Sequence, residues 1–200
     1  MKKVLYVDCC IRGNESRTKK IADEFINNLK GYELDYLNLM EEDLKPLYGK
    51  FFEDRQILLE NNERNHERFR YAHQYANADM VVIAAPFWDL NFPALLKIYI
   101  ENISVDGITF KSTAEGLKGL CKADKLVFIT SRGGIFKEGD EMECALPYLR
   151  AFLPYYGFKE LRYIAANGMD IQGFDSKGSL EKAINEAQLL AKELSLTLDN

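Results

Sequence analysis

Five short apolar segments alternate along the chain with stretches in which apolar residues recur every three or four positions. The apolar segments cover residues 4–7, 32–39, 80–85, 125–130 and 161–165, and their length and content predict strands. The stretches at residues 18–29, 54–78, 93–103, 141–156 and 180–194 have helical periodicity. Strands that alternate with helices indicate an α/β fold with a parallel sheet and helices on both of its faces.

Local signals refine these boundaries. Gly31 and Gly157 stand where helices stop, and Pro93 suits the first turn of a helix. Residues 54–78 are highly charged and predict either one long helix or two broken ones. Five strands suit the flavodoxin-like doubly wound order 2-1-3-4-5, in which ligands bind beyond the carboxyl ends of the strands, at the switch point between strands 1 and 3.

Composition narrows the class of protein. The 200 residues are 47% hydrophobic and 28% charged, which is ordinary for a globular chain, and no linker divides them, so we expect one domain over residues 1–200. A net charge of -5 argues against nucleic acid and anionic membrane as partners. The four cysteines show neither disulfide-scaffold nor metal-ligand spacing, and no signal peptide or membrane span is evident. We therefore expect a reduced, cytoplasmic protein.

The loop after the first strand, residues 8–18, leads into a predicted helix. Ser16 is a good N-cap, and Arg17 and Thr18 fall in the first helical turn. A helix N-terminus offers unpaired N–H groups, so a phosphate could bind there, although Ser16 could equally serve only to cap the helix. The loop has neither a Walker sequence nor the glycine fingerprint of dinucleotide-binding folds.

Two further loops follow buried strands at the same sheet edge. Residues 86–93 place the only Trp, Trp88, and two Phe between two prolines, which suggests a wall for a flat ring or, alternatively, a small satellite core. Residues 131–135 contain Gly133 and Gly134, which would let the backbone approach a ligand closely or would form a plain turn.

These loops, in this order and spacing, resemble the FMN-dependent NADH-azoreductases of the flavodoxin-like NAD(P)H quinone reductase superfamily. The resemblance extends over almost the whole chain and is carried by residues 84–93, 107–110, 130–135 and 147–149, with 131–135 the most specific piece. It implies an enzyme that takes electrons from NADH or NADPH and passes them through FMN to quinones or azo aromatic compounds, with ping-pong kinetics. It also implies a homodimer with active sites at the interface.

The resemblance assigns the cofactor site residue by residue. Cys10, Ser16, Arg17 and Thr18 would hold the FMN phosphate. The isoalloxazine would be lined by Phe87, Trp88, Asp89 and Leu90, and its pyrimidine end would meet Ser131, Arg132, Gly133 and Gly134. Phe110 and Tyr155 would line the substrate pocket. No side chain is assigned a catalytic role, because the flavin carries the chemistry.

The first strand end departs from the family pattern. Cys9 and Cys10 stand where relatives usually carry Ser or Thr, and a thiol is a weak hydrogen-bond donor, so phosphate contacts would be weaker. Arg17 stands where a neutral residue is common and would compensate with charge. The departure keeps open a binding protein that has lost FMN. A flavodoxin-like electron carrier is the other alternative, although the net charge of -5 and the cysteine-containing loop argue against it.

Other titratable residues are interpreted as structural. His66 and His73 are expected to be solvated histidines rather than metal ligands, and no metal site is predicted. Cys9 and Cys10 are expected to be ordinary thiols rather than a redox pair, because adjacent cysteines form a disulfide only with strain.

Overall fold

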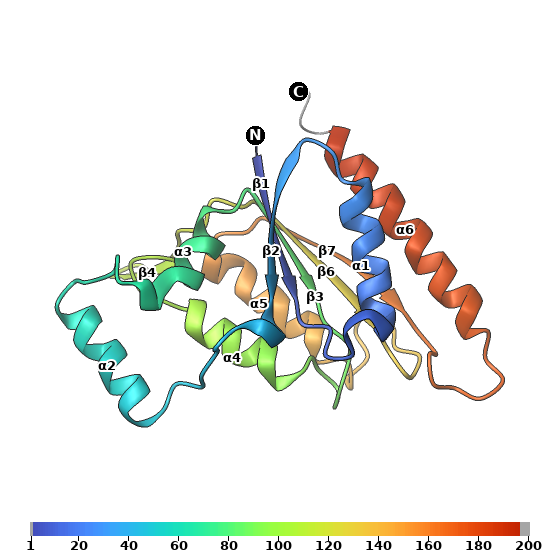
Figure 1. The fold of residues 1–200 in the computed structure, drawn as a ribbon, viewed down its shortest axis with the longest axis horizontal. Coiled ribbons are helices and arrows are strands. Elements are labelled where there is room, and N and C mark those ends of the chain that lie inside the picture. The colour runs from blue at the N-terminus through green and yellow to red at the C-terminus, as the bar shows by residue number, and fades with distance from the viewer. Residues whose placement is uncertain (1, 197–200) are drawn as a thin grey trace.

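The computed structural model describes residues 2–196 and contains a five-stranded parallel sheet (Figure 1). Its strands are β1 (Lys2–Asp8), β2 (Tyr32–Asn38), β3 (Met80–Ala84), β6 (Lys125–Ser131) and β7 (Glu160–Ala166), in the order β2-β1-β3-β6-β7. Counted among these five strands alone, the order is the predicted 2-1-3-4-5. The switch point therefore lies between β1 and β3, which pair directly from Val4 with Met80 to Asp8 with Ala84.

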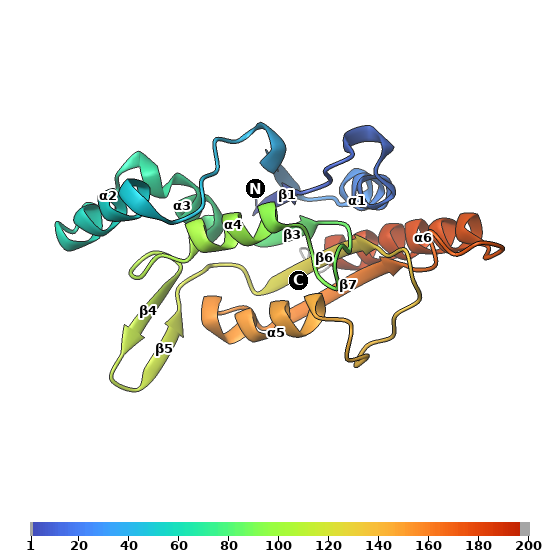
Figure 2. The same cartoon turned by 90° about the horizontal axis from the view of Figure 1, so that it is seen from below.

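Alternate residues of the central strands face opposite cores. On one face, Val4, Tyr6 and Val82 pack with helices α1 (Arg17–Asn28) and α6 (Ser176–Leu196). On the other face, residues such as Leu5 and Val81 pack with α3 (Arg70–Asn77), α4 (Ala94–Ile103) and α5 (Ala145–Tyr156). Figure 2 shows the sheet between these two helical layers. Helices cover both faces because the central strands present apolar side chains to both sides.

Several predicted boundaries are wrong by a few residues. Pro93 is the N-cap of α4 and not a residue of its first turn. The helix predicted from residue 141 begins only at Ala145, because residues 141–144 form the approach to α5. Gly31 has a φ of 85° but lies two residues beyond the C-cap Leu29, so it shapes the turn into β2 rather than ending α1. Gly157 does end α5, with a φ of 94°.

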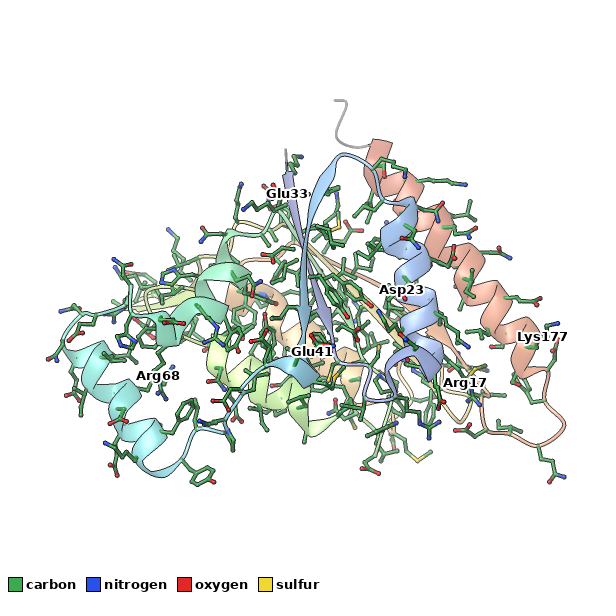
Figure 3. The ribbon with its side chains drawn as sticks, viewed as in Figure 1. Arg17, Asp23, Glu33, Glu41, Arg68 and Lys177 are labelled. Atoms are coloured by element: carbon green, nitrogen blue, oxygen red, sulfur yellow. The ribbon has the colours of Figure 1, made fainter. Side chains whose placement is uncertain are left out.

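The highly charged residues 54–78 do not form one long helix. They belong to separate helices, as the second of the two predicted alternatives has it. These are α2 (Gly49–Glu60), a 3-10 turn (Glu67–Phe69) and α3. Helix α2 has no buried residue and projects from the body of the protein (Figure 1). Arg68, whose position is labelled in Figure 3, holds it through a bond to the Phe51 carbonyl, and Arg55 bonds to the Ser104 carbonyl at 2.7 Å.

A β-hairpin lies outside the main sheet and was not predicted. Strands β4 (Phe110–Thr113) and β5 (Gly116–Gly119) pair antiparallel. The hairpin extends from the α4 side toward the carboxyl end of α5, away from the loops at the carboxyl ends of the strands (Figure 2). The Cys121 N–H ties the following chain to the Tyr156 carbonyl at 3.0 Å.

None of the helices between residues 2 and 196 combines the length and the apolar character that a membrane span requires.

Candidate functional site

Loops from four strands line an open cleft at the carboxyl edge of the sheet. Its lining comprises Arg12, Glu15, Ser16, Arg17, Pro86, Phe87, Trp88, Ser131, Arg132, Gly133, Met169 and Asp170. The three predicted loops therefore do meet at the switch point. Met169 and Asp170, which follow β7, were missed, although β7 ends at the same edge and its loop could have been included on that ground.

The N-terminus of α1 opens into this cleft. The buried Ser16 is its N-cap, and the Ser16 hydroxyl accepts a hydrogen bond from the Lys19 N–H at 3.2 Å. Within residues 2–196, the N–H groups of Arg17 and Thr18 have no partner. Free N–H groups and the positive end of the helix dipole make this an anion-binding end. Figure 3 shows Arg17 at this end of α1.

A buried carboxylate fixes the chain just before this helix end. Asp8 is 1% exposed and accepts hydrogen bonds from the Cys10 N–H and from the Tyr36 hydroxyl, both at 2.8 Å. Lys19 lies 3.3 Å from the same carboxylate. Burial and the bond to Asp8 raise the pKa of Tyr36 to about 12, so its hydroxyl remains a donor. Asp8 thus holds the turn that leads from β1 to α1.

The two adjacent cysteines are free, buried thiols, as expected, and not a disulfide. Burial raises the pKa of Cys9 to about 12 and that of Cys10 further still, with the nearby Asp8 charge adding to both. The Cys10 thiol lies 3.7 Å from the Ala84 carbonyl. Cys10 does not itself line the cleft.

Thr18 is also buried and outside the lining of the cleft. Its hydroxyl lies 2.7 Å from the hydroxyl of Ser131, which ends β6. This contact ties the first turn of α1 to the third predicted loop. The predicted cofactor residues Thr18 and Ser131 are therefore in direct contact with each other.

The second loop turns sharply to expose its Trp. Trp88 and Asn91 exchange N–H···O bonds of 2.7 and 2.8 Å around Asp89 and Leu90, whose φ angles are 48° and 66°. Two non-glycine residues in this region are strained, and such strain is typical of functional sites. Trp88 remains 40% exposed, whereas Phe92 is buried against Tyr148. The loop therefore provides both an exposed aromatic residue and a contribution to the core.

A second, more open depression adjoins the cleft. It is lined by Phe87, Trp88, Asp89, Leu90, Gly133, Gly134, Phe136 and Asp170. The Phe87 ring packs on Phe136 with centroids 4.8 Å apart. All four residues predicted to line a flat ring thus surround this depression, beside the anion-binding end of α1.

The glycine pair approaches the fourth loop closely. A side chain at Gly133 would place its Cβ 2.7 Å from Asp170 Oδ2. The chain after β7 pairs with this loop, because the Met169 N–H donates to the Arg132 carbonyl at 3.0 Å and the Asp170 N–H to the Gly133 carbonyl at 3.1 Å. The Gly133 N–H faces the Phe87 carbonyl in the parallel bridge between Phe87 and Arg132, whereas the Gly134 N–H has no partner in the described part of the chain and is available to a ligand.

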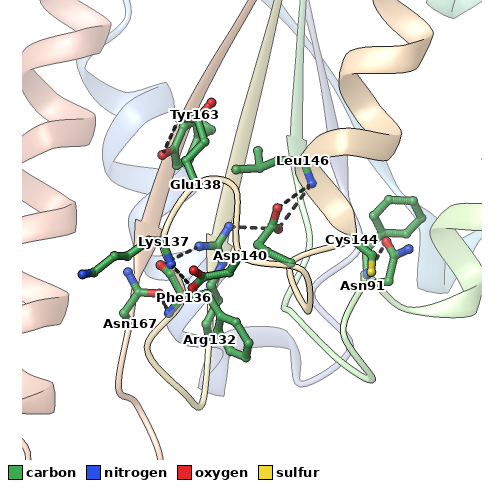
Figure 4. A network of polar contacts seen from close by, with 12 residues as sticks. Asn91, Arg132, Phe136, Lys137, Glu138, Asp140, Cys144, Leu146, Tyr163 and Asn167 are labelled. Carbon is green, nitrogen blue, oxygen red and sulfur yellow. Dashed lines mark hydrogen bonds and ion pairs between the residues drawn. The ribbon is translucent and has the colours of Figure 1, made fainter.

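Unlike Gly133 and Gly134, Arg132 uses its side chain in a buried ion pair. Its guanidinium and the Glu143 carboxylate are 2% and 1% exposed and lie 3.1 Å apart. Glu143 also accepts the Leu146 N–H at the start of α5, and Arg132 donates to the Phe136 carbonyl at 3.4 Å (Figure 4). Burial lowers the pKa of Arg132, and Glu143 opposes that shift. The Arg132 side chain is thus engaged in holding residues 132–144 to α5.

The two predicted substrate residues lie elsewhere in the chain. Phe110 of β4 and Tyr155 near the carboxyl end of α5 pack together with ring centroids 4.4 Å apart. Neither lines the cleft or the adjoining depression. Within one chain, Phe110 and Tyr155 are therefore not brought to the site.

The histidines are engaged locally. His66 Nδ1 accepts a bond from the Arg68 N–H, and His73 Nε2 lies 2.7 Å from the Arg64 carbonyl. Residues 2–196 contain no cluster of three or more metal-ligating side chains.

Comparison with known proteins connects this geometry to a family. Residues 2–190 match a family model described as having the flavodoxin-like fold. The chain is 40% identical to FMN-dependent NADH:quinone oxidoreductase 2 of Clostridium perfringens (strain 13 / Type A), with 96% of this chain and all of the relative aligned. It is also 40% identical to FMN-dependent NADH:quinone oxidoreductase of Clostridium beijerinckii, over 96% of this chain and 99% of the relative.

Solved structures agree in fold. An azoreductase from Bacillus anthracis str. Sterne superposes with a TM-score of 0.84 at 25% identity, over 96% of this chain and all of that one. An FMN-dependent NADH-azoreductase from Bacillus anthracis str. Ames Ancestor, solved in complex with FMN, gives the same TM-score at 23% identity, over 98% of this chain and all of that one.

Proposed function

The chain belongs to the flavodoxin-like family that includes the FMN-dependent NADH:quinone oxidoreductases, and from this premise we propose how its own residues serve that reaction. The protein is an FMN-dependent enzyme that takes electrons from NADH. Its acceptors are quinones or azo aromatic compounds. The observation that carries the proposal is the convergence of the predicted loops on one cleft at the β1/β3 switch point.

The residues of the cleft suit FMN. A phosphate would be held at the N-terminus of α1 by the free N–H groups of Arg17 and Thr18, by the Ser16 hydroxyl and by the Arg17 charge. Cys10 shapes this loop through its N–H bond to Asp8 rather than through its thiol. The hydroxyl contact between Thr18 and Ser131 holds the start of α1 against the end of β6.

The adjoining depression would hold the ring system. Phe87 and Trp88 offer aromatic faces, and the Asp89–Leu90 turn presents backbone N–H groups that have no partner within residues 2–196. The free N–H group of Gly134 would stabilise negative charge at the pyrimidine end. When bound, FMN would accept a hydride from NADH and then pass the two electrons to the acceptor.

The chain contributes position and electrostatics rather than a titrating side chain. Burial raises the pKa of the Cys9 thiol to about 12, so this thiol is neutral at the pH of the cell and cannot act as a nucleophile. Arg132 acts by positioning, since Glu143 engages its guanidinium and fixes the loop that carries the two glycines.

We propose a ping-pong mechanism. The ring site is open on the side of the exposed Trp88, and NADH and the electron acceptor would bind there one after the other. Initial rates at varied NADH, measured at several fixed concentrations of benzoquinone, are expected to give parallel double-reciprocal lines. Each substrate is also expected to inhibit competitively against the other at high concentration. Intersecting lines would show that both substrates bind together and would contradict this mechanism.

We further propose that residues 1–200 form one domain and that the protein is a cytoplasmic homodimer. The exposed apolar side chains of the α2 region, Tyr48, Phe52 and Ile57, support a second copy as the covering surface. In such a dimer Phe110 and Tyr155 would reach a substrate pocket from the partner, since they do not reach the cleft of their own chain.

A further inference from the structure

An ion pair crosses the cleft between its phosphate end and its ring end. Arg17 Nη1 lies 2.8 Å from Asp170 Oδ1, and the two side chains are 40% and 71% exposed. Arg17 belongs to the first turn of α1, whereas Asp170 follows β7. Asp170 lines both the cleft and the adjoining depression, so the Arg17–Asp170 bridge lies where the two meet.

The two partners differ in their freedom to move. The Asp170 backbone is held beside Gly133 by its N–H bond to the Gly133 carbonyl, and the preceding Met169 N–H bonds to the Arg132 carbonyl. Its carboxylate lies close to Gly133, where a Cβ would meet Oδ2 at 2.7 Å. Arg17 has a long, half-exposed side chain whose charged contact within residues 2–196 is Asp170. Arg17 can therefore change partners, while the backbone of Asp170 stays beside Gly133 at the edge of the cleft.

A phosphate monoester at the α1 N-terminus would carry close to two negative charges at neutral pH, and it would face the fixed Asp170 carboxylate. Both anions would then compete for the Arg17 guanidinium. We propose that Asp170 sets the affinity for FMN by competing with the cofactor phosphate for Arg17. Arg17 exchanges a carboxylate for a phosphate on binding, and Asp170 is a positioning residue that weakens the phosphate end of the site.

This inference rests on the proposed function, since it requires FMN to bind in the cleft. It adds a determinant of FMN affinity, because the bridge reduces the difference in affinity between FMN and the same flavin without phosphate. Riboflavin, which has no phosphate, should be insensitive to the Arg17–Asp170 bridge. The ratio of the two affinities therefore reports on the bridge separately from folding and from ring binding.

The test measures dissociation constants of FMN and riboflavin by quenching of flavin fluorescence. Asp170→Asn is expected to tighten FMN binding about fivefold, because it removes a competing surface pair and a like charge. Arg17→Gln is expected to weaken FMN binding about tenfold, because a charge-assisted bond is lost. Both variants should bind riboflavin within about twofold of the original chain, as expected where no phosphate charge is present.

Arg12 provides a matched control, because it also lines the cleft but has no side-chain partner among the residues described. Asp170→Asn should lose its effect in the Arg17→Gln background and keep it in the Arg12→Gln background. Glu193→Gln, which removes a remote carboxylate paired with Arg162, should leave FMN affinity unchanged.

The outcomes separate the two claims. If the original chain binds neither flavin, the proposed function fails. If it binds FMN but Asp170→Asn leaves that affinity unchanged, weakens it, or alters riboflavin affinity equally, the present inference fails while the proposed function stands. Circular dichroism of each variant establishes that it is folded, which is expected because Arg17 and Asp170 are exposed.

Discussion

Glu143→Gln is expected to lower the free energy of unfolding by about 3–5 kcal/mol, because it leaves the buried Arg132 guanidinium without its counter-charge. Arg132 and Glu143 are almost completely excluded from solvent. Glutamine keeps the size of the side chain, so the loss isolates the charge. Urea denaturation should show the change, and the melting temperature should fall by about 6–20 °C.

Two further variants sharpen this prediction. Glu138→Gln removes an exposed carboxylate of the same segment, paired with Arg150, and should cost less than about 1 kcal/mol. The double variant R132M/E143L, which replaces the buried pair with apolar side chains, should recover most of the stability lost in Glu143→Gln. A Glu143→Gln protein as stable as Glu138→Gln would show that the buried pair does not hold residues 132–144 to α5.

Gly119→Ala is expected to destabilise the protein by about 3 kcal/mol, at the upper end of overpacking effects. A Cβ at this position would lie 2.0 Å from the Gly157 nitrogen and 2.2 Å from the Tyr156 carbonyl carbon. Both are backbone atoms at the end of α5, where Gly157 has a φ of 94° and donates to the Leu153 carbonyl. No side chain can move aside, so the hairpin or the helix end must shift.

The control for this variant is Leu117→Ala, which places alanine at an exposed position of the same strand. It should change the free energy of unfolding by less than about 0.5 kcal/mol. Thermal and urea denaturation of both variants measure the contrast. Equal stability of the two would mean that β5 does not pack on the end of α5 as closely as the structure has it.

The sheet could be predicted from sequence because its central strands are buried on both faces. Continuous apolar runs such as residues 80–85 have no other stable place in an α/β protein, and the alternation with helices fixes parallel pairing. The hairpin at residues 110–119 could not be predicted in this way, because its strands are short and mostly exposed and carry no apolar alternation. Its place depends on the glycine contact with α5.

The cofactor loops could be located because parallel strands end at one edge. What each side chain does there was less predictable. Arg132 was expected to meet the ligand, yet a carboxylate eleven residues away engages its side chain. Asp170 was missed because no local pattern relates it to Arg17, 153 residues earlier. Such long-range pairing of charges depends on the tertiary fold and leaves no periodic signal in the sequence.

The FMN-dependent NADH oxidation assigned to this chain is tested most directly by an anaerobic titration of the FMN-loaded protein with NADH, followed by absorbance. We expect the purified protein to retain FMN through gel filtration, and an equimolar amount of NADH to bleach the flavin band. Subsequent addition of benzoquinone should restore the band. A protein that retains no FMN after loading, or one whose bound flavin NADH does not bleach, would contradict the assignment as an FMN-dependent NADH oxidoreductase.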